Sequence, residues 1–107
     1  MAEVVLTEGH NGGTVQARVG DTITIALPEN PTTGFRWTVS AADAVLLAPT
    51  GNDFQLTGSG TGGGGERTFR FLAKGQGNAD LELRLARSWD TGAPSDVFHA
   101  RVRVSTH

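Results

Sequence analysis

The sequence of 107 residues contains no cysteine. This absence excludes a fold stapled by disulfides, a thiol nucleophile, a CxxC redox pair and a thiolate zinc site. A chain of this length forms one domain with one hydrophobic core, so its stability must come from packing alone. We therefore expect a single domain over residues 1–107 that contains no disulfide.

Long apolar runs and clusters of positive charge are also missing. No run of about 18 apolar residues occurs, and the first residues lack the basic and apolar segments of a signal peptide. The formal net charge is −2 without a basic stretch, which argues against nucleic acid or a membrane as a partner. Two locations stay open: the cytoplasm, or export followed by removal of a leader.

Residues that could support catalysis or bind a metal ion are scattered. The three histidines, His10, His99 and His107, have no spacing that suits a shared metal ion. The sequence also lacks the Gly-X-Ser-X-Gly motif of a nucleophile elbow. It therefore predicts a protein that is not an enzyme and that uses neither a metal ion nor a cofactor.

Apolar and polar residues alternate with a period of two along most of the chain, as is typical of β-strands with one buried face. The segment Ala41–Leu47 fits either a helical turn or a short strand, and further strands are expected at Val4–Leu6 and Asp53–Thr57. The apolar positions of the alternating segments are Val15, Ala17, Val19, Ile23, Ile25, Leu27, Phe35, Trp37, Val39, Phe69, Phe71, Ala73, Leu81, Leu83, Leu85, Phe98, Ala100, Val102 and Val104.

Strands with one buried and one exposed face indicate antiparallel sheets that pack face to face. Short turns that contain glycine, such as Gly20–Asp21, separate the strands. Seven to eight strands at this spacing predict an all-β fold, namely an immunoglobulin-like antiparallel β-sandwich without a disulfide.

Three connections between the expected strands are too distinctive to be simple turns. They are Pro28–Gly34, Gly58–Gly65 and the segment that runs from Arg87 to Asp96. Alternate connections of an antiparallel sandwich lie at the same end. The three are therefore expected to form one surface, provided that the segment 41–47 adds no crossing strand.

Each connection allows a structural and a functional interpretation. The stretch 30–34 is either a common proline turn or a stiff tip that loses little entropy on binding. The glycine run 58–65 is either a flexible linker or a bare backbone that pairs with a partner. It is not a dinucleotide loop, because a strand follows from Glu66 where a helix would be needed. Trp89 is either a core residue or an exposed anchor. Trp37 is expected in the core, because it occupies an inward-facing position in the alternation of its own strand.

Taken in order, the three connections resemble the motifs of the chagasin family of cysteine-peptidase inhibitors, and the resemblance covers essentially the whole chain. The first motif matches at every residue: Asn30, Pro31, Thr32, Thr33, Gly34 and Phe35. The glycine motif fits best at Gly62, Gly63, Gly64 and Gly65. The third motif comprises Arg87, Ser88 and Trp89, with serine where the family usually has proline, so this loop is expected to be less rigid.

The resemblance implies a chagasin-like inhibitor domain, monomeric when free, whose partner is a papain-like cysteine peptidase. Its three loops would block the active-site cleft reversibly and without covalent chemistry. Thr32 would approach the catalytic cysteine and histidine, the glycine tract would line the non-primed side, and Trp89 would stack on an aromatic wall on the primed side. The alternative function is an adhesion or carbohydrate-binding module that stacks Trp89 on a sugar ring.

Overall fold

The computed structural model describes residues 2–30, 34–56, 64–87 and 96–106, which form eight β-strands and one short 3-10 helix. The all-β prediction is therefore confirmed. The strands are β1 (Glu3–Leu6), β2 (Thr14–Arg18), β3 (Thr22–Glu29), β4 (Phe35–Ala42), β5 (Leu47–Leu56), β6 (Gly65–Ala73), β7 (Gly77–Arg87) and β8 (Asp96–Ser105), and the helix η1 covers Glu8–His10.

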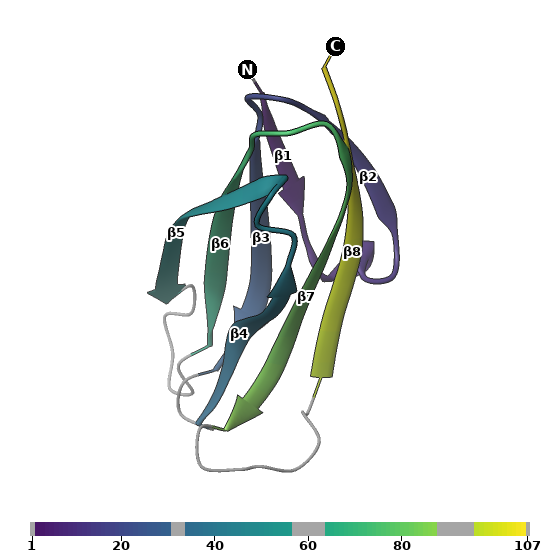
Figure 1. The fold of residues 1–107 in the computed structure, drawn as a ribbon. Helices are drawn as coiled ribbons and strands as arrows, with labels where there is room; N and C mark the ends of the chain where they lie inside the picture. The colour runs from purple at the N-terminus through teal and green to yellow at the C-terminus, as the bar shows by residue number, and fades with distance from the viewer. Residues whose placement is uncertain (1, 31–33, 57–63, 88–95, 107) are drawn as a thin grey trace.

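The strands form two four-stranded sheets that face each other as a sandwich (Figure 1). One sheet has the order β1-β3-β6-β5 and the other the order β2-β8-β7-β4. If β1 is taken as the first strand of an immunoglobulin domain, these orders reproduce its ABED and GFC sheets, with β2 added beside β8. The immunoglobulin-like sandwich predicted from the alternation is confirmed.

The expectation of purely antiparallel sheets is wrong at one edge of each sheet. β1 pairs with β3 in parallel and β2 pairs with β8 in parallel, whereas the other four pairings are antiparallel. The chain alternates between the two sheets from β1 to β3 and reverses direction at each step. β1 and β3 therefore run the same way where they meet, and β2 comes to lie parallel to β8.

The segment 41–47, for which the sequence left two possibilities, adds no strand of its own. β4 ends at Ala42, a turn follows, and β5 begins at Leu47, earlier than the expected start at Asp53. Asp43 stabilises this turn, because its main-chain oxygen accepts a hydrogen bond from the Leu47 N–H at 2.9 Å and its side chain accepts one from Val45. Because the segment 41–47 adds no crossing strand, the condition under which the three connections were expected at one end of the sandwich is met.

The buried faces of the strands follow the predicted alternation closely. Five positions depart from it: Val39 and Val19 are 39% and 41% exposed, and Val15, Phe35 and Leu85 are half-buried. Val19 lies just beyond the end of β2. Val39 pairs with the buried Leu83 and so shares its face, but it lines an open hollow with Pro49 and Phe71 of the other sheet, which leaves its side chain accessible to solvent. The alternating positions that are buried are Ala17, Ile23, Ile25, Leu27, Trp37, Phe69, Phe71, Ala73, Leu81, Leu83, Phe98, Ala100, Val102 and Val104.

Candidate functional site

The strand ends that flank the three connections all lie at one end of the sandwich (Figure 1). In one sheet Gly65, at the start of β6, pairs with both Glu29 and Leu56, the last residues of β3 and β5. In the other sheet Phe35, at the start of β4, pairs with Arg87 at the end of β7. The main-chain register therefore gathers the roots of the connections in the way that the sequence predicted.

The structure describes part of the predicted site. Pro31, Thr32, Thr33, Gly62, Gly63, Ser88 and Trp89 lie outside the described residues. The predicted site residues that are described, and that the fold brings to this end, are Asn30, Gly34, Phe35, Gly64, Gly65 and Arg87.

A shallow hollow opens between the ends of the two sheets. Residues of the first motif and of the glycine motif meet in it, so the fold joins two motifs that lie far apart in the sequence. The residues that line the hollow are Pro28, Glu29, Asn30, Phe35, Gly64, Gly65 and Leu85.

The glycines at this end of the sandwich differ in why glycine is needed at their positions. Gly34 has a φ of 80°, a left-handed conformation that favours glycine and closes the first connection. A Cβ atom on Gly65 would lie 2.6 Å from the main-chain oxygen of Gln55 and would collide with the ring of Phe54. Gly64 has nothing within 4 Å of the position of a Cβ. Gly65 is therefore required by packing, whereas packing within the described chain does not require Gly64.

A buried carboxylate, that of Glu29, lies at the root of the first connection and was not among the predicted site residues. The Glu29 side chain is 1% exposed, and one of its oxygens accepts a hydrogen bond from the main-chain N–H of Trp37 at 2.7 Å. Arg67 forms an ion pair with it, with Nη2 at 2.8 Å from Oε1. The sequence pattern could have identified both residues. Glu29 lies two residues after the buried Leu27 of β3, and Arg67 lies two residues before the buried Phe69 of β6, so the alternation puts both on the inner faces of their strands.

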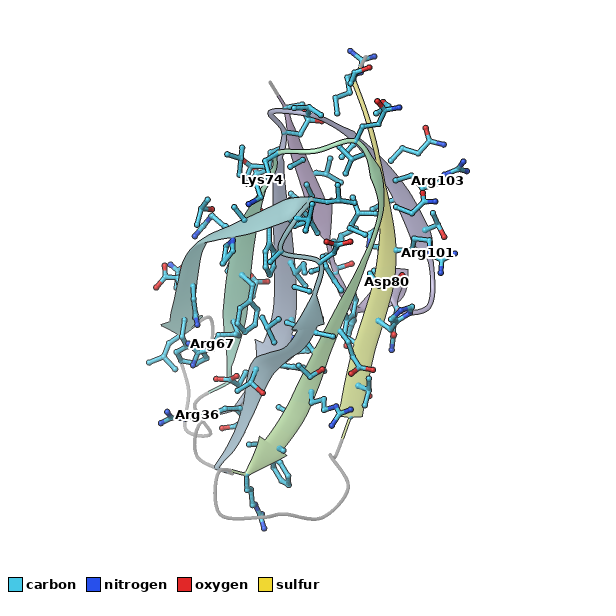
Figure 2. The ribbon with its side chains drawn as sticks, viewed as in Figure 1. Arg36, Arg67, Lys74, Asp80, Arg101 and Arg103 are labelled. Carbon is cyan, nitrogen blue, oxygen red and sulfur yellow. The ribbon has the colours of Figure 1, made fainter. Side chains whose placement is uncertain are left out.

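Arg67 is itself held by the neighbouring edge strand. Its Nη1 donates a hydrogen bond to Oδ1 of Asn52 at 3.1 Å, and its guanidinium lies 5.1 Å from the centroid of the Phe54 ring. Both partners are on β5, the strand that precedes the glycine connection. The pair of Glu29 and Arg67 and its partners therefore join the four strands β3, β4, β5 and β6, whose ends border the first two connections, and Figure 2 shows Arg67 near this end.

The third connection is joined to the first by an aromatic contact. The guanidinium of Arg87 lies 4.4 Å from the centroid of the Phe35 ring, in the geometry of a cation–π interaction. Trp37, two residues further along β4, is 6% exposed, and its Nε1 donates a hydrogen bond to the main-chain oxygen of Pro28 at 2.9 Å. The prediction that Trp37 belongs to the core is confirmed.

Carboxylates with shifted pKa values lie away from this end. Main-chain N–H groups of Arg18 and Ala2 donate to Asp21 and lower its pKa, but Asp21 is in the turn before β3, at the opposite end of that strand. The hydroxyl of Ser40 donates to Glu82 and lowers the pKa of that carboxyl on the exposed face of β7. Neither group is positioned to act in the candidate site.

Metal-binding clusters and membrane-spanning helices are absent from the described ranges 2–30, 34–56, 64–87 and 96–106. Within them, no group of three or more histidine, aspartate or glutamate side chains is arranged to hold a metal ion. Nor do these ranges contain a helix with the length and apolar character needed to cross a membrane.

Known proteins are similar to this chain in sequence and in fold. The chain is 32% identical over 96 residues to Chagasin of Trypanosoma cruzi, which covers 85% of this chain and 86% of the relative. The crystal structure of the cysteine protease inhibitor EhICP2 from Entamoeba histolytica matches with a TM-score of 0.88 at 24% identity, over 97% of this chain and 96% of that one. PbICP-C, solved in complex with falcipain-2, matches with a TM-score of 0.69 at 13% identity, over 96% and 89% of the two chains.

The family itself is identified by a profile match. Residues 16–102 match the profile described as chagasin family peptidase inhibitor I42, which covers most of the sandwich and all three connections. This match and the similarity to Chagasin confirm the resemblance that the motifs indicated. The chain therefore belongs to the chagasin family of peptidase inhibitors and is not an enzyme.

Proposed function

We propose that this protein inhibits papain-like cysteine peptidases reversibly, by placing its three connections in the active-site cleft without forming a covalent bond. The observation that carries the proposal is the gathering of the strand ends at Glu29, Phe35, Leu56, Gly65 and Arg87. Chagasin is a relative, EhICP2 is named as a cysteine protease inhibitor, and PbICP-C was solved bound to falcipain-2. Family membership favours this function over the adhesion or carbohydrate-binding alternative.

Each connection has a chemical role in the proposal. The stretch from Asn30 to Gly34, stiffened by Pro31, enters the cleft with Thr32 nearest to the catalytic cysteine and histidine of the peptidase. The glycine tract presents main-chain N–H and C=O groups that pair with the peptidase beside the cleft. Trp89 packs on an aromatic surface at the far side and supplies the largest single share of the affinity.

The described residues refine the second contact. Gly64 has open space around it, so its main chain can be approached closely, whereas the place of Gly65 is taken up by Phe54 and Gln55. Leu56, the last residue of β5, is 60% exposed beside the same tract. We assign Gly64 and Leu56 to the peptidase-binding surface, and Gly65 to the packing that supports it.

The experiment is a titration of papain with the purified chain, with a fluorogenic peptide as substrate. Inhibition at nanomolar concentrations that is reversed by dilution, with no change in the mass of either protein, is the expected result. Trypsin, a serine peptidase, is the control and should stay active. Full papain activity at micromolar inhibitor would overturn the proposal. Quenching of tryptophan fluorescence by glycans, without any effect on papain, would instead support the sugar-binding alternative.

A further inference from the structure

One carboxylate holds both ends of the first connection. Glu29 is the last residue of β3, immediately before the connection, and Trp37 lies near the start of β4, just after it. The Glu29 side chain accepts the main-chain N–H of Trp37 at 2.7 Å. Because a single side chain bridges the two strands that enter and leave the connection, it sets the distance and direction at which the loop begins and ends.

The same carboxylate is tied to both ends of the glycine connection through Arg67. Nη2 of Arg67 lies 2.8 Å from Oε1 of Glu29, and its Nε lies 3.3 Å from each oxygen of that carboxylate. Arg67 is on β6, which follows the glycine connection, and its Nη1 reaches Asn52 on β5, which precedes it. The forked guanidinium thus joins strands on either side of the second loop.

We propose that Glu29 and Arg67 are positioning residues that fix the first two inhibitory connections relative to each other. The inference rests on the proposed function, because it assigns the pair a role in the affinity for the peptidase. Glu29 is 1% exposed and the Arg67 side chain is 20% exposed, so the pair is shielded from the solvent that weakens surface ion pairs.

A positioning role explains why two charges occupy this place in the core. The cost of removing both charges from water offsets much of their attraction, and apolar side chains of similar size often stabilise a fold equally well. Apolar side chains, however, do not prescribe the direction of a contact, whereas the carboxylate and the guanidinium accept only a narrow set of angles. Loops that are already in place lose less entropy on binding and so bind more tightly.

The test uses Glu29→Gln, because glutamine can still accept the Trp37 N–H but carries no charge for Arg67. Asn52→Ala is a second variant, on the exposed edge strand, that removes one support of Arg67 with little risk to folding. The matched control is Asp80→Asn, which breaks the ion pair between Asp80 and Arg101 (3.1 Å) on the outer face of β7 and β8 (Figure 2).

Two readouts are needed, both at a temperature at which circular dichroism shows every variant to be fully folded. Glu29→Gln is expected to raise the inhibition constant for papain about three- to tenfold. Calorimetry should show that the weaker binding comes from a less favourable binding entropy, because the loops must be ordered on binding. It should also accelerate hydrogen exchange in peptides that cover residues 30–34 and 57–64. Asn52→Ala should do the same to a smaller extent, and Asp80→Asn should change neither readout.

The outcomes separate this inference from the proposed function. If the wild-type chain fails to inhibit papain, the proposed function is wrong, and hydrogen exchange at the two connections still decides whether the pair positions them. If the wild type inhibits but Glu29→Gln matches it within about twofold, with unchanged exchange, the positioning role is overturned. If Asp80→Asn weakens inhibition as much as Glu29→Gln does, the effect is not specific to the pair, and the positioning role is overturned as well.

Discussion

The guanidinium of Arg87 lies 4.4 Å from the centroid of the Phe35 ring, and the two residues are direct neighbours in the register of β4 and β7. Phe35 closes the first motif and Arg87 opens the third. The contact therefore links two motifs that are separated by half of the sequence. Together with the ion pair of Glu29 and Arg67, it connects the roots of all three proposed inhibitory loops.

Arg87→Gln is predicted to weaken papain inhibition about two- to fivefold, because a neutral side chain loses the attraction of the Phe35 ring, which is worth about 0.5–1 kcal/mol at an exposed site. The inhibition constant is the measurement. Arg103→Gln is the control, since Arg103 is an exposed arginine on β8 that lies away from the connections. Equal inhibition constants for the two variants would show that the contact has no bearing on binding.

The two tryptophans are predicted to respond in opposite ways. Trp89→Ala should weaken inhibition about 30-fold or more, as expected for an aromatic anchor, and leave the melting temperature nearly unchanged. Trp37→Phe removes the hydrogen bond to Pro28 and some buried volume, so it should lower the free energy of unfolding by about 1–2 kcal/mol. Thermal melts and papain titrations of both variants check this. A large fall in melting temperature for Trp89→Ala would place that residue in the core instead.

Adjacent glycines allow a matched test of the glycine motif. Gly65→Ala is predicted to lower the free energy of unfolding by about 1–3 kcal/mol, because its Cβ would meet Phe54 and the main chain of Gln55. Gly64→Ala should leave stability unchanged, since no atom lies within 4 Å of its Cβ position, but should weaken papain inhibition by preventing close approach. Chemical denaturation and inhibition constants separate the two effects. Wild-type inhibition by Gly64→Ala would remove that residue from the proposed contact.

Leu56→Ser tests whether the binding surface extends to the end of β5. Leu56 is 60% exposed, so the substitution should leave the melting temperature unchanged. Loss of an apolar contact with the peptidase should raise the inhibition constant about fivefold to thirtyfold, which corresponds to roughly 1–2 kcal/mol from buried apolar area. Val45→Ser is the control, because Val45 is 77% exposed in the turn between β4 and β5. A similar small effect of both substitutions would contradict the assignment.

Asp21 is predicted to make the stability depend on acid pH. Hydrogen bonds from the main-chain N–H groups of Arg18 and Ala2 lower the pKa of its carboxyl below the ordinary value of 3.8. A carboxyl whose pKa is lowered by folding stabilises the protein above its unfolded pKa, and this contribution disappears as the pH falls through the lowered folded value. The stability difference between wild type and Asp21→Asn should therefore be largest near neutral pH and shrink below about pH 4.

Urea denaturation at a series of pH values measures that difference. Glu66→Gln, which removes an exposed carboxylate from β6, serves as the control for the loss of one negative charge. A stability difference between wild type and Asp21→Asn that stays constant from neutral pH to pH values below 3.8 would contradict the proposed linkage.

The alternation of residues by itself determined which face of each long strand is buried. Positions such as Ile23, Ile25 and Leu27 could be assigned because the period of two depends only on neighbours in the chain and on the exclusion of apolar side chains from water. The family motifs could be read in the same way, since each is a contiguous run of residues. A sandwich of seven to eight strands could be predicted from these local patterns, and so could the common end of the three connections on the condition that the segment 41–47 adds no strand, which the structure meets.

The tertiary structure decided what depends on register between distant segments. Alternation placed Glu29 and Arg67 on buried faces, but only the pairing of β3 with β6, which sets Arg67 opposite Leu27, brings the two charges within 2.8 Å. The parallel pairings of β1 with β3 and of β2 with β8 likewise follow from the path of the chain between the sheets. Burial is a property of each residue, whereas the partner of a buried charge is a property of the assembled sheets, and this is why only the structure shows what supports the inhibitory loops.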